Sequence, residues 1–316
     1  MEQRQSSTKI AGIDVGKLRL DAAVHGLEDT LQVENGPAGI AELIGWLRAR
    51  EVGRVGLEAS GGYERAVRQA LEAGGFEVVV HQPLEVRLFA RLKRQRAKND
   101  QLDARLIAAA TAQVETVRAA RDPQLAELAE RLTAYELVTD KAADLKTLLE
   151  SIAKEVAATL RAALRSLERA KAKLLAEVLA RLKARPDLLQ RFRLLLSLPG
   201  VGPVVAATLV VRMPELGALR RGQAASLIGV APFDRDSGQW RGQRFIHGGR
   251  SRPRRMLYLA ALAAKRCSPG LKAFAETLAA RGKPKKLVVV AVMRKLIEAA
   301  NLVLSRGQPW LKHHPA

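Results

Sequence analysis

The stretch Ile10-Ala11-Gly12-Ile13-Asp14-Val15-Gly16-Lys17 places one carboxylate inside an apolar run that is flanked by glycines. Its β-branched and apolar residues predict a strand from Lys9 to Val15, with Asp14 inside a sheet. Burying an unpaired carboxylate costs several kcal/mol. A divalent cation is one partner that offsets this cost, because hard cations prefer carboxylate oxygens. The stretch therefore predicts an N-terminal sheet domain and marks Asp14 as a candidate metal ligand.

The composition indicates the kind of partner. The chain has 316 residues, of which 48% are hydrophobic and 4% aromatic, enough for two or three domains with aliphatic cores. A net charge of +21 at pH 7 favours a polyanionic partner, nucleic acid before a membrane surface. No apolar run approaches the roughly 18 residues of a spanning helix, and the N-terminus lacks a secretory apolar segment. The single cysteine, Cys267, excludes an internal disulfide and fits the reducing cytoplasm.

The first third of the chain alternates strands and helices. Three consecutive strands indicate antiparallel hairpins, and the alternation after them indicates parallel additions. The pattern predicts a mixed α/β sheet. Further strands are predicted over residues 18–25, 30–34, 54–58 and 76–81, and helices over 37–50, 63–73, 83–92 and 100–113.

Three more carboxylates fall where they can join Asp14. Glu58 ends the fourth predicted strand, and Asp100 and Asp103 stand three residues apart on one helix face. Taken alone, Asp100 could simply favour the first turn of its helix, and Asp103 could be a surface acid. Together the four acids in a basic chain predict a site for two divalent ions, which is the arrangement used in phosphodiester chemistry. We expect Mg²⁺.

A basic run leads into this helix, and no acid lies among its cations. We expect it to guide phosphates, and a solvated helix face is the alternative. Its cations are Arg87, Arg91, Lys93, Arg94, Arg96 and Lys98.

The middle of the chain predicts a helical arm. After Pro123, no glycine or proline occurs up to Lys183. The arm is expected either to fold back as a hairpin, with Lys171 to Lys173 as the candidate turn, or to pair with another subunit as a homo-oligomer, a dimer or tetramer. Its coiled-coil seam is predicted from two heptad rows: Leu128, Tyr135, Ala142, Leu149 and Val156, and Val138, Leu145 and Ile152.

The last third predicts a mostly helical domain with two loop motifs. The segment Leu198-Pro199-Gly200-Val201-Gly202-Pro203 resembles the hairpin of helix-hairpin-helix modules, in which glycines let backbone amides approach a phosphate. A tight turn between helices is the alternative. In the second motif, Asp236-Ser237-Gly238 precedes arginines suited to forked phosphate contacts. These arginines are Arg241, Arg244, Arg250, Arg252, Arg254 and Arg255.

Four segments carry a resemblance to one family. The strand with Asp14, "LEASGGYE" around Glu58 and "AKNDQLDA" around Asp100 and Asp103 resemble the N-terminal domain of DEDD-type insertion-sequence transposases. The segment "APFDRDSGQWRGQRFIHGGRSRPRRMLYLAAL" resembles their C-terminal domain. The family usually has Thr where this chain has Asn99, which can also cap a helix.

The resemblance implies an RNase-H-like fold similar to RuvC, the Holliday-junction resolvase, with the four acids as Mg²⁺ ligands. It also implies that Ser237 attacks the scissile phosphate and holds DNA as a phosphoserine ester. The partners implied are the DNA of element ends and target, and a structured non-coding "bridge" RNA that selects them. We expect such a protein in the bacterial cytoplasm, associated with the nucleoid.

These inferences give three predicted domains: a RuvC-like catalytic domain (1–120), a coiled-coil arm (121–188) and a C-terminal transposase domain (189–316).

Two other functions stay open. A Mg²⁺-dependent, structure-specific nuclease such as a junction resolvase would need the four carboxylates but not Ser237. A non-catalytic architectural protein would need only the basic patches. The sequence also leaves open whether Ser237 and the carboxylates act within one subunit.

Overall fold

The chain divides into two units, residues 1–121 and 122–316, and each is described by itself. The computed structural model describes residues 8–93, 100–115, 122–234, 241–242 and 244–310, and the side chains of Asp100 and Gln101 lie outside the described part. In this division, the long helices of residues 123–183 belong with the second unit. The predicted division into three domains stays a prediction.

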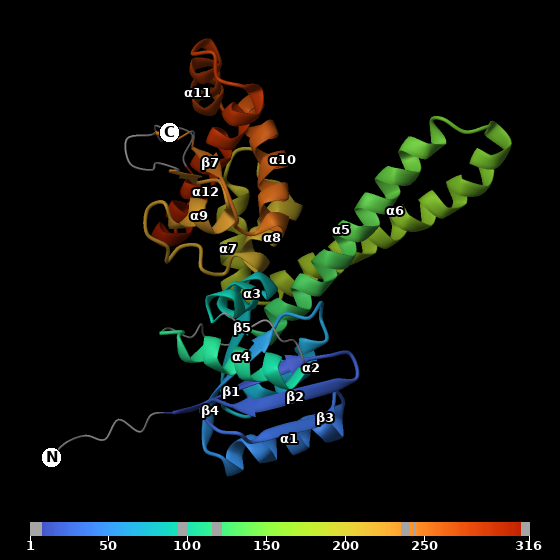
Figure 1. Cartoon of the computed structure of the whole chain (residues 1–316). Helices are drawn as coiled ribbons and strands as arrows, with labels where there is room; N and C mark the ends of the chain where they lie inside the picture. Colours follow the sequence, from blue (N-terminus) through green and yellow to red (C-terminus); the bar gives the residue numbers. More distant parts are fainter. Residues whose placement is uncertain (1–7, 94–99, 116–121, 235–240, 243, 311–316) are drawn as a thin grey trace. The chain divides into compact units, whose positions relative to one another are not determined.

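The first unit contains a mixed five-stranded sheet, as the sequence predicts (Figure 1). The strand order is β3-β2-β1-β4-β5; β2 runs antiparallel to both neighbours, and β1, β4 and β5 are parallel. The predicted ends differ from the observed ones by at most two residues. The elements are β1 (Lys9–Val15), β2 (Arg19–Val24), β3 (Thr30–Glu34), α1 (Pro37–Ala49), β4 (Val52–Glu58), α2 (Glu64–Ala73), β5 (Glu77–His81), α3 (Pro83–Leu92) and α4 (Asp100–Ala112).

One face of the sheet buries aliphatic side chains against α1 and α2. Ile13 of β1 and Leu57 of β4 are fully buried there, together with Leu43 of α1 and Leu71 of α2. Successive strand residues point to opposite faces. The residues between these apolar positions, including Asp14 and Glu58, therefore point to the other face.

That other face is covered by α4, which approaches the strands closely. A side chain at Gly12 would overlap the backbone of Ala104 and Ala108 in α4, and one at Gly56 would overlap Thr111. The two glycines pair with each other across β1 and β4. Small residues at these positions therefore let a helix lie directly on the sheet.

The second unit begins with the arm. Helices α5 (Pro123–Leu149) and α6 (Lys154–Lys183) form an antiparallel hairpin (Figure 1). The predicted turn at Lys171 to Lys173 is wrong, because the chain reverses at residues 150–153 and Lys171 to Lys173 lie within α6. Ala153 is extended there without a side-chain cap, so no residue type marks the reversal. The predicted coiled-coil geometry stays a prediction.

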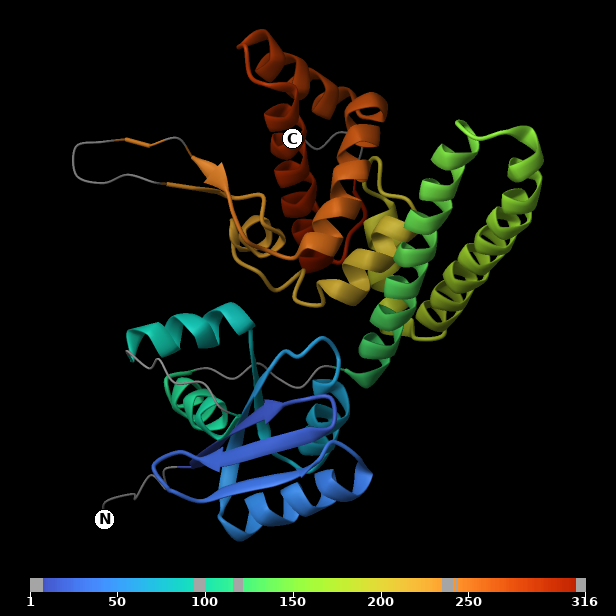
Figure 2. The same cartoon turned by 45° about the vertical axis from the view of Figure 1, so that its right-hand side comes forward.

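The rest of the second unit is mostly helical, as predicted. Helix α8 is buried along nearly its whole length, and α10 packs beside α12 (Figure 2). The short strands β6 and β7 pair as the stem of a ribbon, drawn in orange in Figure 2. The elements are α7 (Pro186–Leu196), α8 (Pro203–Arg212), α9 (Gln223–Ile228), β6 (Pro232–Phe233), β7 (Phe245–Ile246), α10 (Ser251–Cys267), α11 (Pro269–Ala280) and α12 (Lys285–Arg306).

The close contact of α4 gives a test of the fold. We expect Gly12→Ala to lower the free energy of unfolding by about 1–3 kcal/mol, because the new methyl group forces α4 away from β1. The matched control is Gly45→Ala in the exposed interior of α1, where nothing lies within 4 Å of the added methyl group. That change should raise stability by up to about 1 kcal/mol through helix propensity. Urea unfolding followed by circular dichroism measures both, and equal midpoints for Gly12→Ala and the unchanged protein would contradict the packing.

Candidate functional site

Polar side chains form a row across the sheet on the face that α4 covers. Asp14 of β1 pairs with Asp21 of β2, and Asp21 pairs with Gln32 of β3. Residues directly opposite each other in antiparallel strands point to the same face. The two aspartates are therefore neighbours, and Gln32 Nε2 donates a hydrogen bond of 2.8 Å to Asp21 Oδ1.

The row continues through the parallel strands. Ile13 pairs with Leu57, so Asp14 and Glu58 are the next residues on their two strands. Glu58 in turn pairs with His81 of β5. The structure thus brings the two predicted strand carboxylates side by side at the carboxyl ends of β1 and β4, and both are half-buried.

Asp103 comes to this region from α4. It is half-buried and lies one turn before Ile107, whose side chain faces Gly56. Because α4 rests on Gly12 and Gly56, the side of the helix that carries Asp103 lies against the sheet. Asp100 begins α4, and its side chain lies outside the described residues.

The carboxylates fit a hard cation by their chemistry, since each offers oxygen ligands of the kind that Mg²⁺ prefers. Asp14, Glu58 and Asp103 also have polar interactions of their own. Among the side chains that the structure describes, no three His, Cys, Asp or Glu residues are arranged to hold a metal ion. Asp100, the fourth predicted ligand, is not among those side chains.

Buried hydrogen bonds connect the β5 end of this polar row to α4. Thr111 Oγ1 donates to the Ile107 carbonyl oxygen at 2.7 Å and lies 2.8 Å from His81 Nε2. Because the hydroxyl proton is used on Ile107, the Nε2 atom of His81 must donate to the hydroxyl oxygen. Burial lowers the pKa of His81, and the nearby Glu85 opposes this shift. The neutral imidazole therefore ties β5 to α4 beside Glu58.

The sequence analysis missed Asp21, Gln32 and His81. Asp21 had the same signal as Asp14, because it interrupts the apolar strand Leu20-Asp21-Ala22-Ala23-Val24. Gln32 and His81 gave no signal of their own. Their relevance comes from strand register, which a single sequence does not contain.

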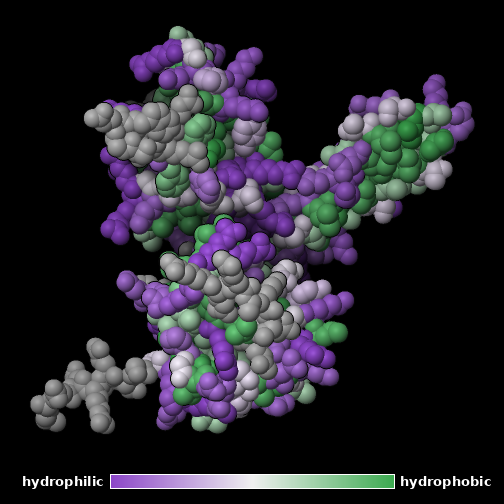
Figure 3. All heavy atoms as spheres, in the orientation of Figure 1, coloured by the Kyte–Doolittle hydropathy of each residue, from purple (hydrophilic) through white to green (hydrophobic). Residues whose placement is uncertain are grey.

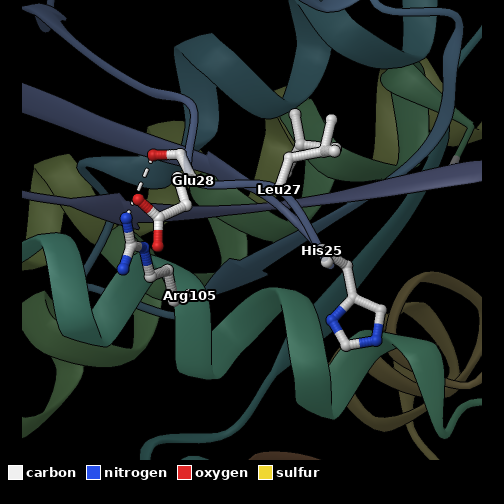
Figure 4. Close-up of a pocket in the computed structure, with 6 residues that line it drawn as sticks. His25, Leu27, Glu28 and Arg105 are labelled. Carbon is white, nitrogen blue, oxygen red and sulfur yellow. Dashed lines mark hydrogen bonds between the residues drawn. The ribbon is translucent and has the colours of Figure 1, made fainter.

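A pocket of about 260 Å³ lies on another side of α4. It is lined by the turn between β2 and β3 and by Arg105, whose Nη2 donates to the Glu28 carbonyl oxygen at 3.0 Å (Figure 4). Arg105 follows Asp103 by two positions, so the two side chains leave the helix in nearly opposite directions. This pocket is therefore separate from the carboxylate row.

The predicted phosphate-binding arginines of the second unit mostly have partners inside that unit. Arg250 makes a forked ion pair with Glu215, at 2.5 and 2.8 Å. Arg254 donates to the Gly229 and Gly248 carbonyl oxygens, and Arg244 pairs with Asp234. Arg241 is exposed. Their predicted binding to nucleic acid stays a prediction.

Two of these arginines hold the arm to α10. Arg255 makes a forked pair with Asp140 of α5 at 2.5 and 2.8 Å, and its hydrogen bonds lower the pKa of Asp140. Arg252 pairs with Glu136 of α5, one turn away and buried. Glu136 also lies 3.3 Å from Arg212 of α8, whose pKa is lowered by burial. The middle of α5 is thus held by charge on two sides.

The glycine turn before α8 has a packing role. Gly200 has a φ of 74°, and a side chain there would overlap the backbone of Ala260 and Ala264 in α10. Gly202 precedes α8 as its extended N-terminal residue. The predicted phosphate contacts of both glycines, and the likeness to a helix-hairpin-helix module, stay predictions.

The remaining predicted site residues are those of the basic run before α4 and Ser237. Arg87, Arg91 and Lys93 of the basic run are exposed on or just after α3. Arg94, Arg96, Lys98 and Ser237 lie outside the described residues. The ribbon stem that flanks the segment with Ser237 lines a pocket of about 390 Å³, together with Ser226 and Gly248.

Comparison with known proteins identifies the class. Residues 11–158 match a family model described as "Transposase", and residues 192–276 match one described as "Transposase IS116/IS110/IS902 family". The matches follow one another in chain order and define a DNA-rearranging enzyme of the transposase class. The chain belongs to the IS110 family of insertion-sequence transposases.

Relatives agree with this assignment over the length of the chain. The "Pilin gene-inverting protein" of Moraxella bovis and that of Moraxella lacunata are each 24% identical over 312 residues, covering 95% of this chain and 97% of the relative. Two solved structures of Thermus thermophilus RuvC, one in complex with a Holliday junction substrate, are similar at 19% identity and a TM-score of 0.29. They cover 35% of this chain and 98% and 99% of their own chains.

Within the described parts of the chain, no helix is both long enough and apolar enough to cross a bilayer.

The arginine contacts predict different effects for two substitutions. We expect Arg252→Ala to lower the free energy of unfolding by about 1–2 kcal/mol, because Glu136 is buried while Arg252 itself is half-exposed. Arg241→Ala, at an exposed site, should leave stability unchanged. It should instead reduce the dependence of nucleic-acid affinity on salt by about one unit of slope. Thermal unfolding and fluorescence anisotropy at several salt concentrations test this. Equal losses of stability in both variants would contradict the assignment of Arg252 to the arm.

Proposed function

We propose that the chain cleaves and exchanges DNA strands at the ends of an insertion sequence, with Mg²⁺ at the carboxylates and Ser237 as nucleophile. The observation that carries the proposal is the strand register that sets Asp14 beside Glu58, beneath the helix that bears Asp103. The transposase matches in both halves of the chain supply the reaction class. The Moraxella relatives, named for inverting a pilin gene, support the same class of DNA rearrangement.

The carboxylates have a defined task in this proposal. Asp14, Glu58, Asp100 and Asp103 would hold the metal, and Mg²⁺ would supply positive charge to the scissile phosphate. The half-burial of Asp14, Glu58 and Asp103 limits the water around them and strengthens their attraction for a cation. The buried pair of His81 and Thr111 keeps α4 on the strands, which fixes Asp103 relative to Glu58.

Ser237 would perform the covalent step. Its Oγ forms a bond to phosphorus while the bond from phosphorus to a deoxyribose oxygen breaks. The hydroxyl proton leaves to a base, and the departing oxygen takes up a proton. Attack by the deoxyribose oxygen of another strand reverses the step and completes the exchange. The role rests on the family resemblance of the segment around Ser237.

The partners in the proposal are DNA and a structured non-coding guide RNA. The charge of +21 is compatible with both polyanions. The exposed Arg91 and Lys93 and the exposed Arg241 are candidates to contact their backbones. We place the protein in the bacterial cytoplasm at the nucleoid.

The arm would join copies of the chain into a dimer or tetramer. Buried residues of the seam, such as Leu128 and Tyr135, lie in the inner half of α5. Towards the outer end, Leu148 is 45% and Val156 is 55% exposed. Figure 3 shows apolar surface gathered on this outer part of the arm. Contact between arms of two copies would remove that surface from water.

The metal site is tested by Asp103→Asn, which removes one charge with little change of shape. We expect strand exchange to fall by about 100-fold or more, while DNA and RNA binding persists, because the basic surfaces are untouched. The control is Asp144→Asn on the exposed arm, where the carboxylate pairs only with Lys141 among the described residues. Activity is measured with labelled DNA carrying the element ends. Asp103→Asn protein with near-normal activity at ordinary Mg²⁺ would overturn the four-carboxylate site.

The nucleophile is tested by Ser237→Ala. A catalytic serine predicts normal folding and DNA binding with no strand exchange and no covalent adduct. A serine that only stabilises the turn predicts a loss of about 1 kcal/mol of stability with activity retained. The control is Ser151→Ala at the exposed end of the arm. A denaturing gel of labelled DNA shows the adduct, and adduct formation by Ser237→Ala protein would place the attacking group elsewhere.

A further inference from the structure

The ribbon of β6 and β7 carries two exposed aromatic side chains. Phe233 is 46% and Phe245 is 53% exposed, whereas the other four phenylalanines of the chain are buried or half-buried. Phe245 also has an interaction of its own, and about half of its surface still lies open to solvent. Aromatic rings are large apolar surfaces, so leaving two of them in water gives up stability that burial would supply. The pair therefore indicates a binding surface.

The strand register places the two rings beside each other. Phe233 pairs with Phe245, and residues directly opposite each other in antiparallel strands point to the same face. Both line a pocket of about 390 Å³, a size within the range of roughly 300–1,000 Å³ that is usual for ligand pockets. Ser226 and His247 add polar groups to the lining, and both can form hydrogen bonds with a ligand. The pocket thus combines aromatic surface with hydrogen-bonding groups.

The chain next to the ribbon is held against the helical part of the unit. Gly249 lies so close to Gly229 at the end of α9 that a side chain on Gly249 would overlap the Gly229 backbone. Arg254 of α10 donates hydrogen bonds to the Gly229 and Gly248 carbonyl oxygens. The backbone that follows β7 is therefore fixed in place, which lowers the entropy cost of binding a ligand there.

The charges around the pocket favour a nucleobase inside it rather than a phosphate. Asp234 is part of the lining, and Arg244 neutralises it. The described lining contains no lysine or arginine, so it offers an anion no strong partner. The exposed Arg241 lies four residues before Phe245 along the chain and is a candidate to contact a phosphate next to a bound base. Proteins bind unpaired bases of nucleic acids by stacking them on aromatic rings.

We propose that Phe233 and Phe245 form a stacking site for an unpaired nucleobase. Ser226 and His247 would contact the edge of that base. In a duplex the faces of each base are covered by its neighbours, so only a base that has left the stack can lie on these rings. The inference deepens the proposed function and rests on it for the nature of the partner, because strand exchange separates paired strands. DNA and RNA share the chemistry that the site recognises.

The test compares the binding of the full chain to labelled single strands of equal length: a DNA, an RNA of the same sequence and an abasic DNA. The abasic strand keeps the phosphates and lacks the bases. The double variant Phe233→Leu with Phe245→Leu keeps apolar side chains and removes both rings. Its affinity for a base-bearing strand should fall by about 10-fold or more. Its affinity for the abasic strand and the salt dependence of binding should not change, because the cations are untouched.

Two further variants serve as controls. Tyr258→Leu removes an exposed ring of α10 and should change the affinity for none of the strands. Phe245→Trp keeps an aromatic surface on the ribbon and should retain the affinity for the base-bearing strands. Fluorescence anisotropy measures the affinities, and thermal unfolding shows whether each variant is folded.

The outcomes separate the inference from the proposed function. A loss confined to the DNA or to the RNA would support the stacking site and identify the strand that uses it. Unchanged affinity of the double variant for both base-bearing strands would overturn the inference, assign the ribbon to a protein contact and leave strand exchange standing. An equal loss on the abasic strand, together with a lower melting temperature, would give the rings a structural role and also overturn it. The absence of any binding of DNA or RNA by the unchanged protein would overturn the proposed function together with the inference.

Discussion

The first unit depends on the direct contact between α4 and the sheet at Gly12 and Gly56. These two glycines pair across neighbouring parallel strands. The backbone of Ala104 and Ala108 lies against Gly12, and the side chains of Ile107 and Thr111 lie against Gly56. The contact excludes water from the middle of the sheet and sets how far α4 stands from the strands. Because the polar row lies two residue pairs further along the strands, the distance between Asp103 and the strand acids follows from the same contact. A packing constraint thus determines the geometry of the candidate chemistry.

The sequence predicted the strands well because their signals are local. Alternation of apolar residues and turn glycines place each strand of the first unit within two residues of its observed end, and the three initial strands followed by alternation gave the mixed sheet. The two-residue strands β6 and β7 of the second unit were not predicted. It also selected Asp14, Glu58 and Asp103, which the fold places on one face. It could not give the register, so the adjacency of Asp14 to Asp21 and of Glu58 to His81 was out of reach. The reversal of the arm at residues 150–153 was missed, because no residue there breaks a helix by its own chemistry.

The arginine-rich segment shows why charge alone is an ambiguous signal. A row of arginines after a loop predicts phosphate binding equally well whether the side chains face solvent or an acid of the same unit. In the structure, Arg250, Arg252 and Arg255 each face a carboxylate from a distant part of the chain, and those acids carry no marker in the sequence. These three arginines are therefore neutralised within the unit, and the excess positive charge that can meet a polyanion is carried by other cations of the chain.

The ion pairs between α5 and α10 have a mechanical consequence. Helix α10 follows the ribbon of β6 and β7 along the chain after a short link, and ion pairs hold it to the middle of α5 through Glu136 and Asp140. A lateral load on the far end of α5 and α6 would act on these ion pairs with the leverage of two long helices. A load on the arm would therefore be shared between these two ion pairs and the apolar contacts through which α5 and α10 join the same core.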